Sequence, residues 1–337
     1  MGNKVKWGIL GNAKIGREKV IPALQKSPYC KVVAIASRDK VQVKKTARLL
    51  KIGKAYGSYE ELLNDKDIEA VYIPLPNHLH VDWAIKCIAA GKHVLCEKPI
   101  GLSYTDALRL MEASAAHPKI KVMEGFMYRF HPQWIQVKRL INLNRIGELK
   151  MVQSFFSYYN ADPSNIRNKV DVGGGALMDI GCYGISLSRF LFGEEPDSVM
   201  GSIERDPEMH TDKITSGMLE FPKGRAIFTC ATQLMPYQRV NVMGTAGRIE
   251  IEMPFNPLPD QQTKITLYTK EGQEDMIFEA ADQYTLQASA FSKAIVNDEA
   301  VPYPIQDALN NMKVIDAILE SARVKREVNF PATGDKR

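Results

Sequence analysis

The 337-residue sequence has no long apolar run and only a small excess of positive charge. No stretch approaches the roughly 18 to 20 apolar residues that a membrane-spanning helix requires, which argues against a membrane protein. The net charge of +5 is spread along the chain without basic runs, which argues against a nucleic-acid-binding protein. Residues 1–4 lead directly into an apolar strand and lack the layout of an export signal, so we expect a cytoplasmic protein.

Cysteine and histidine are scarce, and neither is arranged as in a metal centre. The cysteines are odd in number and scattered, and we expect them to be reduced thiols: Cys30, Cys87, Cys96, Cys182 and Cys230. The six histidines also offer no set of ligands. We therefore predict no metal.

The first 125 residues alternate apolar strands with helices, a pattern that predicts a doubly wound parallel sheet. We expect strands at residues 5–10, 31–36, 70–73, 93–95 and 121–124. Ligands bind such sheets beyond the carboxyl ends of the strands. The residues that follow or end these strands should therefore share one edge: Gly11, Ser37, Asn77, Lys98 and Glu124.

A degenerate glycine motif lies between the first strand and a helix that runs to about residue 26. It reads Gly11-Asn12-Ala13-Lys14-Ile15-Gly16, with Ala13 in place of the middle glycine of the dinucleotide fingerprint. The first glycine suits a tight turn, the small residue at 13 allows a pyrophosphate to approach, and Gly16 suits close packing of the helix. The alternative is an ordinary strand–turn–helix junction.

The second strand ends in Ser37-Arg38-Asp39. An acid that grips the ribose hydroxyls of NAD usually stands at this distance from the glycines. A hydroxyl and a guanidinium suit the 2′-phosphate of NADP instead, so we predict NADP over NAD. Asp39 is expected to cap the next helix. The alternative is that Arg38 is a solvated surface charge.

The segment Cys96-Glu97-Lys98-Pro99 places two charges at the end of a buried strand. Charged groups there are costly unless they have partners or a function. A surface Glu-Lys pair before a turn is the alternative.

A second polar constellation follows three consecutive glycines, Gly173–Gly175. Asp179 and Tyr183 are four residues apart in a predicted helix over 176–191, which places them on one face. We expect the glycines to let the backbone approach a ligand. The alternative is an ordinary amphipathic helix with a half-buried tyrosine.

Taken in order, these motifs resemble the glucose–fructose oxidoreductase/inositol dehydrogenase/rhizopine catabolism (Gfo/Idh/MocA) family. The resemblance spans nearly the whole chain and rests on the glycine motif, Pro76-Asn77-x-x-His80, Glu97-Lys98-Pro99, Tyr128-Arg129-x-His131-Pro132 and Gly173-Gly174-Gly175-x-x-x-Asp179-x-x-x-Tyr183. It implies an NAD(P)-dependent oxidoreductase acting on a sugar, polyol or dihydrodiol. Tyr183 stands where many members carry histidine, which resembles the branch of NADP-dependent D-xylose dehydrogenase and dimeric dihydrodiol dehydrogenase.

The resemblance also implies roles for individual residues. Lys98, Asp179 and Tyr183 would be catalytic, with Tyr183 or Lys98 carrying the proton. The cofactor would contact Gly11, Ala13, Lys14, Ile15, Gly16, Ser37, Arg38, Pro76, Asn77, His80, Glu97 and Lys98. Arg129 would contact substrate or, as an equal alternative, pair with a carboxylate in a structural role.

The implied domains are a Rossmann domain over residues 1–125 and a substrate-binding domain over 126–304, with a final helix at 305–325 packing back on the first. The second domain should hold a large open, mostly antiparallel sheet, and we expect a homodimer or higher oligomer to form through it. The tail from residue 331 onward is expected to be disordered.

Two other kinds of function remain compatible with these patterns. One is a non-catalytic NADP-binding sensor or co-regulator on the same fold. The other is a purely structural two-domain protein. The joint presence of Lys98, Asp179 and Tyr183 favours the enzyme.

Overall fold

The computed structural model describes residues 4–331, and its first part is built on a six-stranded sheet. All neighbouring strands are parallel, in the order β3-β2-β1-β4-β5-β6. This is the strand order of a dinucleotide-binding sheet, and it confirms the predicted doubly wound architecture. The strands are β1 (Val5–Leu10), β2 (Cys30–Ala36), β3 (Lys54–Tyr56), β4 (Ala70–Ile73), β5 (His93–Cys96) and β6 (Val122–Glu124).

Helices connect these strands, and several begin at the expected caps. The Asp39 carboxylate accepts from the backbone N–H groups of Val41 and Gln42 at 3.0 and 2.9 Å, which confirms its capping role. The Ser58 hydroxyl caps the next helix in the same way. The helices are α1 (Ile21–Lys26), preceded by a π-helical turn at Gly16–Val20, α2 (Lys40–Leu49), α3 (Tyr59–Leu63), α4 (His80–Ala89) and α5 (Tyr104–Ala116).

Helix α8 (Gln283–Val296) belongs with this sheet, although it follows the second domain in the sequence. Trp7 of β1 donates its indole N–H to Ser292 at 3.2 Å, and its ring lies 5.7 Å from that of Phe291. One unit therefore comprises the chain up to Met127 together with Asp282–Met312. The other comprises Tyr128–Ala281 together with the chain from Lys313 onward. The second domain predicted from the sequence, residues 126–304, included α8, whereas the structure places α8 in the first unit.

The second unit is organised on a nine-stranded sheet in the order β14-β13-β12-β11-β7-β10-β9-β8-β15. Only β7 and β10 pair in parallel, so the predicted mostly antiparallel sheet is confirmed. The strands are β7 (Leu149–Tyr159), β8 (Ser198–Arg205), β9 (Asp212–Phe221), β10 (Gly224–Ala231), β11 (Gln233–Gly244), β12 (Gly247–Ile251), β13 (Thr263–Thr269), β14 (Gly272–Phe278) and β15 (Val328–Asn329).

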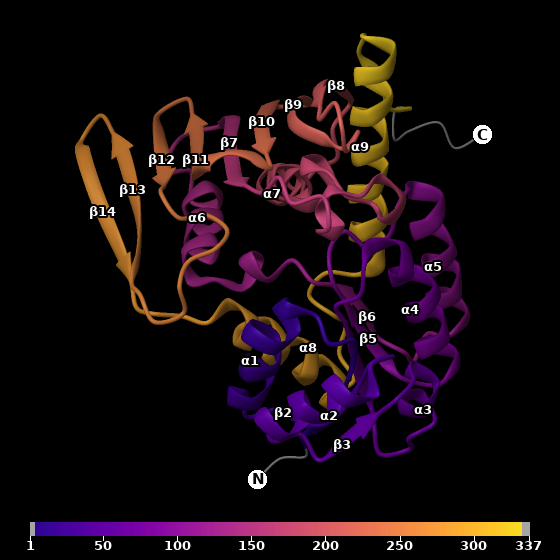
Figure 1. The fold of residues 1–337 in the computed structure, drawn as a ribbon. Helices are drawn as coiled ribbons and strands as arrows, with labels where there is room; N and C mark the ends of the chain where they lie inside the picture. The colour runs from indigo at the N-terminus through magenta and orange to yellow at the C-terminus, as the bar shows by residue number, and fades with distance from the viewer. Residues whose placement is uncertain (1–3, 332–337) are drawn as a thin grey trace. The chain divides into compact units, whose positions relative to one another are not determined.

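Figure 1 shows α6 (Pro132–Asn142) and α7 (Cys182–Phe192) on one side of this sheet. Two glycines allow α7 and the turn before it to approach the strands closely. A Cβ at Gly184 would lie 2.9 Å from Phe228, and one at Gly181 would lie 2.8 Å from the sulfur of Cys230. Helix α9 (Ile305–Val324) packs Ile318 and Ser321 against Gly201 of β8.

Two short strands differ from the prediction. The strands β3 and β15 have three and two residues, too few to show a periodic pattern, and neither was predicted from the sequence. The predicted disordered tail lies outside the described residues, except for Pro331.

The cap of α6 provides a test of acid sensitivity. His131 is 1% exposed, and its Nδ1 accepts a hydrogen bond from the backbone N–H of Gln133, so the neutral ring is the capping form. Burial lowers the pKa of His131 to about 4, against about 6.5 in an unfolded chain. The folded state is therefore favoured above pH 6.5, and this stability is lost as the pH falls toward 4, by up to about 3 kcal/mol.

We expect His131→Asn to flatten this dependence, because asparagine also caps helices but does not titrate in this range. The measurement is the free energy of unfolding in urea from about pH 7 to 4. His117→Asn, at an exposed position, is the control and should keep the wild-type slope. An unchanged slope in His131→Asn would show that the buried ring does not govern acid sensitivity.

Candidate active site

The first unit gathers the predicted polar residues at one edge of its parallel sheet. Gly11, Ser37 and Asn77 follow β1, β2 and β4, while Lys98 follows β5 and Glu124 ends β6. Because all six strands run in the same direction, these positions lie at the same edge of the sheet. The sequence-based expectation of a shared edge is confirmed.

The glycine motif forms the tight turn expected of it. Gly11 has φ +115°, and its backbone N–H donates to the carbonyl of Ala36 at 2.8 Å. A Cβ at Gly11 would lie 3.0 Å from Leu75, so both backbone angle and space favour glycine. A Cβ at Gly16 would make ordinary contact with Pro74 at 3.5 Å, so packing alone would tolerate alanine there.

Arg38 is exposed at the end of β2, beside Tyr59. Burial raises the pKa of Tyr59, and the Arg38 guanidinium partly offsets this through its charge and a side-chain hydrogen bond. Ser37 accepts from the backbone N–H of Asp39 at 3.3 Å. A guanidinium and a hydroxyl thus lie next to the first turn of α2, where an added phosphate would meet donors.

Two buried polar atoms at this edge have no hydrogen-bond partner among residues 4–331. They are Oδ1 of Asn12, inside the glycine motif, and Nδ1 of His78, just before α4. Buried polar atoms in folded proteins are nearly always hydrogen-bonded. The orphaned pair therefore fits a polar ligand such as a dinucleotide at this edge.

His80 has a structural role here, which corrects its prediction as a cofactor contact. Its ring is 1% exposed, and Nδ1 lies 2.8 Å from the carbonyl oxygen of Pro99 and Nε2 lies 2.7 Å from that of Leu75. Burial lowers the pKa of His80 to about 4, so the ring is neutral near pH 7 and its single N–H donates to one of these two carbonyls. His80 ties the loop after β4 to the loop that carries Lys98.

Glu97 is held from within the sheet. The hydroxyl of Tyr72, which is 1% exposed, donates to Glu97 Oε1 at 2.7 Å. Burial, followed by the Glu97 charge, raises the pKa of Tyr72 well above its usual value. Glu97 therefore fixes the start of the loop that carries Lys98. Lys98 is the next residue and is half-buried.

In the second unit, Asp179 is the centre of a charged cluster. Its side chain is 14% exposed, and its Oδ2 accepts from the Tyr158 hydroxyl at 2.5 Å and from Arg167 Nε at 3.0 Å. Burial and the Asp179 charge raise the pKa of Tyr158. The carboxylate is thus held in place from β7 on one side and from the loop after β7 on the other.

Tyr183 lies one turn further on, at the start of α7. Its ring is 5% exposed and packs among Tyr128, Phe156 and Phe255, with ring centres 5.8, 5.9 and 5.3 Å away. The preceding turn, Leu177–Gly181, is π-helical, so the regular four-residue spacing expected between Asp179 and Tyr183 is altered. Such turns are frequent at functional sites.

Two of the three glycines before this turn, Gly174 and Gly175, serve the protein's own packing, which differs from the expectation that they admit a ligand. A Cβ at Gly174 would lie 2.5 Å from the carbonyl oxygen of Arg167, and one at Gly175 would clash with Asp212 Oδ1. Asp212 in turn accepts from the backbone N–H of Leu177 at 2.7 Å. The glycines therefore bring the loop and a capping carboxylate against the first turn.

Arg129 has partners in its own unit. It is 3% exposed and donates through Nη2 to the hydroxyl and the carbonyl of Ser186, at 2.8 and 3.3 Å. These bonds tie Arg129 to α7, and its contact with substrate or with a carboxylate stays a prediction.

Within residues 4–331, no three histidine, cysteine or acidic side chains gather as a metal site would require. Among the helices of the same residues, none combines the length and apolar character that a membrane crossing requires. All five cysteines fall in this part of the chain, where they are buried and none forms a disulfide.

Comparison with known proteins identifies the family. The model of the oxidoreductase family with an NAD-binding Rossmann fold, Gfo/Idh/MocA, matches residues 5–126, and the model of the Gfo/Idh/MocA C-terminal domain matches residues 134–250. The chain belongs to the Gfo/Idh/MocA oxidoreductase family, which confirms the resemblance drawn from its motifs.

Individual relatives match over nearly the full chain. An uncharacterised oxidoreductase of Rhizobium meliloti is 42% identical, covering 94% of this chain and 97% of its own. D-xylose 1-dehydrogenase (NADP(+)) 2 of Haloferax volcanii is 37% identical, covering 96% and 99%. The crystal structure of KijD10, a 3-ketoreductase of Actinomadura kijaniata in complex with NADP and TDP-benzene, aligns with a TM-score of 0.89 at 29% identity, covering 98% and 100%.

Sequence reasoning missed Tyr158, Arg167 and Asp212. Tyr158 continues the row of inward-facing side chains on β7. A hydroxyl at the end of such a row could have been recognised as a candidate site residue. Arg167 lies in a polar loop without periodicity, and Asp212 is brought to the site by the sheet. No local pattern identifies these two residues.

The glycine contacts lead to a stability prediction. Gly175 (φ +114°) and Gly272 (φ +130°) both have backbone angles that side chains rarely adopt, but a Cβ at Gly272 meets nothing within 4 Å. We expect Gly272→Ala to cost about 1–2 kcal/mol, and Gly175→Ala to cost more because Asp212 must also move.

Thermal unfolding midpoints of the two variants measure the difference, with Gly272→Ala as the matched control. Equal losses would show that the approach of Asp212 does not constrain this position.

Proposed function

We propose that the protein is an NADP-dependent dehydrogenase or reductase that transfers a hydride between nicotinamide and a hydroxyl-bearing carbon of a sugar, polyol or dihydrodiol. An aldose such as D-xylose is the first candidate substrate. The observation that carries the proposal is the gathering of Gly11, Ser37, Asn77 and Lys98 at one sheet edge that also holds orphaned polar atoms. The D-xylose dehydrogenase and the ketoreductase support the choice of NADP and of a sugar.

The residues proposed to hold NADP divide by the part of the cofactor they suit. The glycine motif from Gly11 to Gly16, including Ala13, Lys14 and Ile15, would receive the pyrophosphate at a helix start. Ser37 and Arg38 would hold the 2′-phosphate. Pro76, Asn77 and Glu97 would line the nicotinamide side. When bound, the cofactor supplies the acceptor or donor of the hydride.

We assign proton transfer to Tyr183. In oxidation, Tyr183 takes the hydroxyl proton while the hydrogen of the carbinol carbon leaves with its electron pair and a carbonyl forms. A free phenol titrates near pH 10, and a neighbouring cation favours the phenolate needed at neutral pH. Lys98 is proposed as that cation, and Asp179 as a positioning group. The reverse reaction uses the same groups, as a ketoreductase requires.

A panel assay tests the function. We expect NADP reduction, followed by the absorbance of the reduced nicotinamide, with at least one member of a panel of aldoses, polyols and trans-dihydrodiols. Binding of NADP without turnover on any of them would favour the sensor or co-regulator. Failure to bind either nicotinamide cofactor would favour a purely structural protein.

Variants test the assigned roles. Lys98→Met and Tyr183→Phe should each lower turnover by about 10²- to 10⁴-fold, the range of lost acid–base catalysis, while NADP affinity measured by calorimetry is largely kept. Lys119→Met and Tyr159→Phe, at exposed positions, are matched controls. Wild-type turnover in either site variant would refute the role of that residue.

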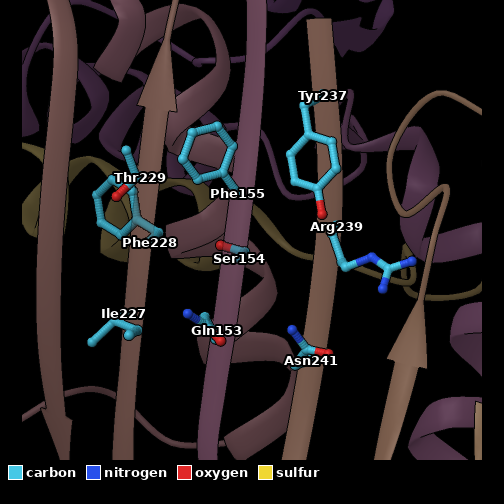
Figure 2. Close-up of a pocket in the computed structure, with 9 residues that line it drawn as sticks. All are labelled: Gln153, Ser154, Phe155, Ile227, Phe228, Thr229, Tyr237, Arg239 and Asn241. Atoms are coloured by element: carbon cyan, nitrogen blue, oxygen red, sulfur yellow. The ribbon is translucent and has the colours of Figure 1, made fainter.

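The face of the nine-stranded sheet away from α7 supports the proposed homodimer. Figure 2 shows an open pocket on strands β7, β10 and β11. The ring of Phe155 lies 5.7 Å from that of Tyr237, which is 52% exposed, and Met235 nearby on β11 is 84% exposed. Exposed apolar side chains grouped on a sheet commonly mark a protein interface.

A charge placed on this face should therefore separate the subunits. We expect a dimeric mass for the wild type by light scattering and a monomeric mass for Tyr237→Glu, because a buried carboxylate without a partner is costly. Val296→Glu, an exposed apolar position on α8, is the control. A monomeric wild type would exclude the dimer at the concentration measured.

A further inference from the structure

Arg167 is a charged side chain held by the carboxylate of Asp179, four residues before the proposed catalytic tyrosine. It lies in the loop between β7 and the π-helical turn, and its Nε donates to Asp179 Oδ2 at 3.0 Å. Its charge also interacts with the phenol of Tyr183, after the larger influence of Asp179. The guanidinium therefore belongs to the same cluster as both residues.

The terminal amino groups of Arg167 are left to donate elsewhere. A guanidinium has five N–H donors, and only the one on Nε is used within residues 4–331. The side chain is 46% exposed, so these groups are accessible from outside the protein. A half-exposed guanidinium that is anchored through Nε presents its remaining N–H donors to a ligand.

The loop is built to hold Arg167 in place. The side chain of Asn165 accepts from the backbone N–H of Arg167 at 3.0 Å, and the carbonyl of Arg167 accepts from Gly175 at 2.8 Å. Asn168, 4% exposed, donates to the carbonyls of Asn160 and Asp162 at 3.2 and 2.8 Å. The backbone is thus fixed on both sides of the arginine, which lowers the entropy lost on binding.

The charge balance indicates the kind of ligand. Arg167 and Asp179 neutralise each other, so the pair offers no net positive charge to a phosphate or carboxylate. The pair instead offers donors beside a carboxylate. This arrangement complements a hydroxyl, which both donates and accepts hydrogen bonds.

We propose that Arg167 is a specificity residue whose terminal amino groups donate to a hydroxyl on the carbon adjacent to the one that is oxidised. The site thereby selects uncharged substrates with neighbouring hydroxyls, such as aldoses with a free 2-hydroxyl. This inference rests on the proposed role of Tyr183, because Arg167 is placed relative to that residue. A role limited to holding the loop would affect stability without distinguishing one substrate from another.

The test combines removal of the arginine with removal of the hydroxyl. The full-length protein is assayed with NADP on D-xylose and D-glucose, each beside its 2-deoxy analogue. We expect the wild type to prefer the hydroxylated sugar by about 10- to 100-fold in kcat/KM, the size of one hydrogen bond to a charged group. Arg167→Met should lose that factor on the hydroxylated sugar and less than about threefold on the deoxy sugar.

Two further variants sharpen the result. Lys169→Met removes an exposed cation from the same loop and should keep the wild-type preference. Arg167→Lys keeps the charge but not the fork, so its preference should fall between those of the wild type and Arg167→Met. Thermal midpoints within a few degrees of the wild type establish that each variant is folded.

The outcomes separate this inference from the proposed function. If the wild type oxidises an aldose but Arg167→Met loses the same factor on both sugars, or loses nothing, the inference alone is overturned. If the wild type oxidises neither aldose with NADP, the aldose assignment fails and the inference fails with it.

Discussion

A carboxylate that is largely removed from water must be paired, and the second unit is arranged around one such group. Asp179 is held at a single oxygen by Tyr158 and Arg167, which come from different segments. For both donors to reach Asp179, β7 must end beside the π-helical turn that carries Asp179, and the loop after β7 must fold back toward it. The loop can fold back because Gly174 lets its backbone pass and Gly175 admits the capping Asp212. Removing any one partner would leave charge or polarity uncompensated.

The first unit also fixes one of its loops through buried polar side chains. The loop carrying Lys98 is fastened by His80, which lies between the carbonyls of Leu75 and Pro99, and by the bond from Tyr72 to Glu97. Both anchors are buried at the carboxyl end of the sheet. Because the loop is tied to two neighbouring strands, Lys98 is presented from a fixed backbone. Preorganisation of this kind is what proton and hydride transfer require of their surroundings.

The parts of this arrangement that sequence could predict are those set by local pattern. Apolar runs of strand length alternating with helices predicted the parallel sheet and the shared edge, because strand direction alone decides which residues meet there. Asp39 was recognisable as a cap from its place before a helix. Helix α8 was assigned to the wrong domain because its amphipathic pattern says which face is buried but not against which sheet. His80 and Gly175 were misjudged for a related reason: their partners, Pro99 and Asp212, are distant in sequence.

Arg167 marks the boundary of what local pattern can reveal. A loop with no periodicity carries a side chain whose proposed role depends on its bond to Asp179, four residues before Tyr183. Loops carry function on many scaffolds because they can vary without disturbing the core. In this fold Tyr183, the residue proposed for proton transfer, lies on a helix where packing restrains it, whereas Arg167 lies in a loop. If Arg167 and Tyr183 act as proposed, a change in the loop after β7 would alter substrate preference while leaving Tyr183 and its aromatic neighbours in place.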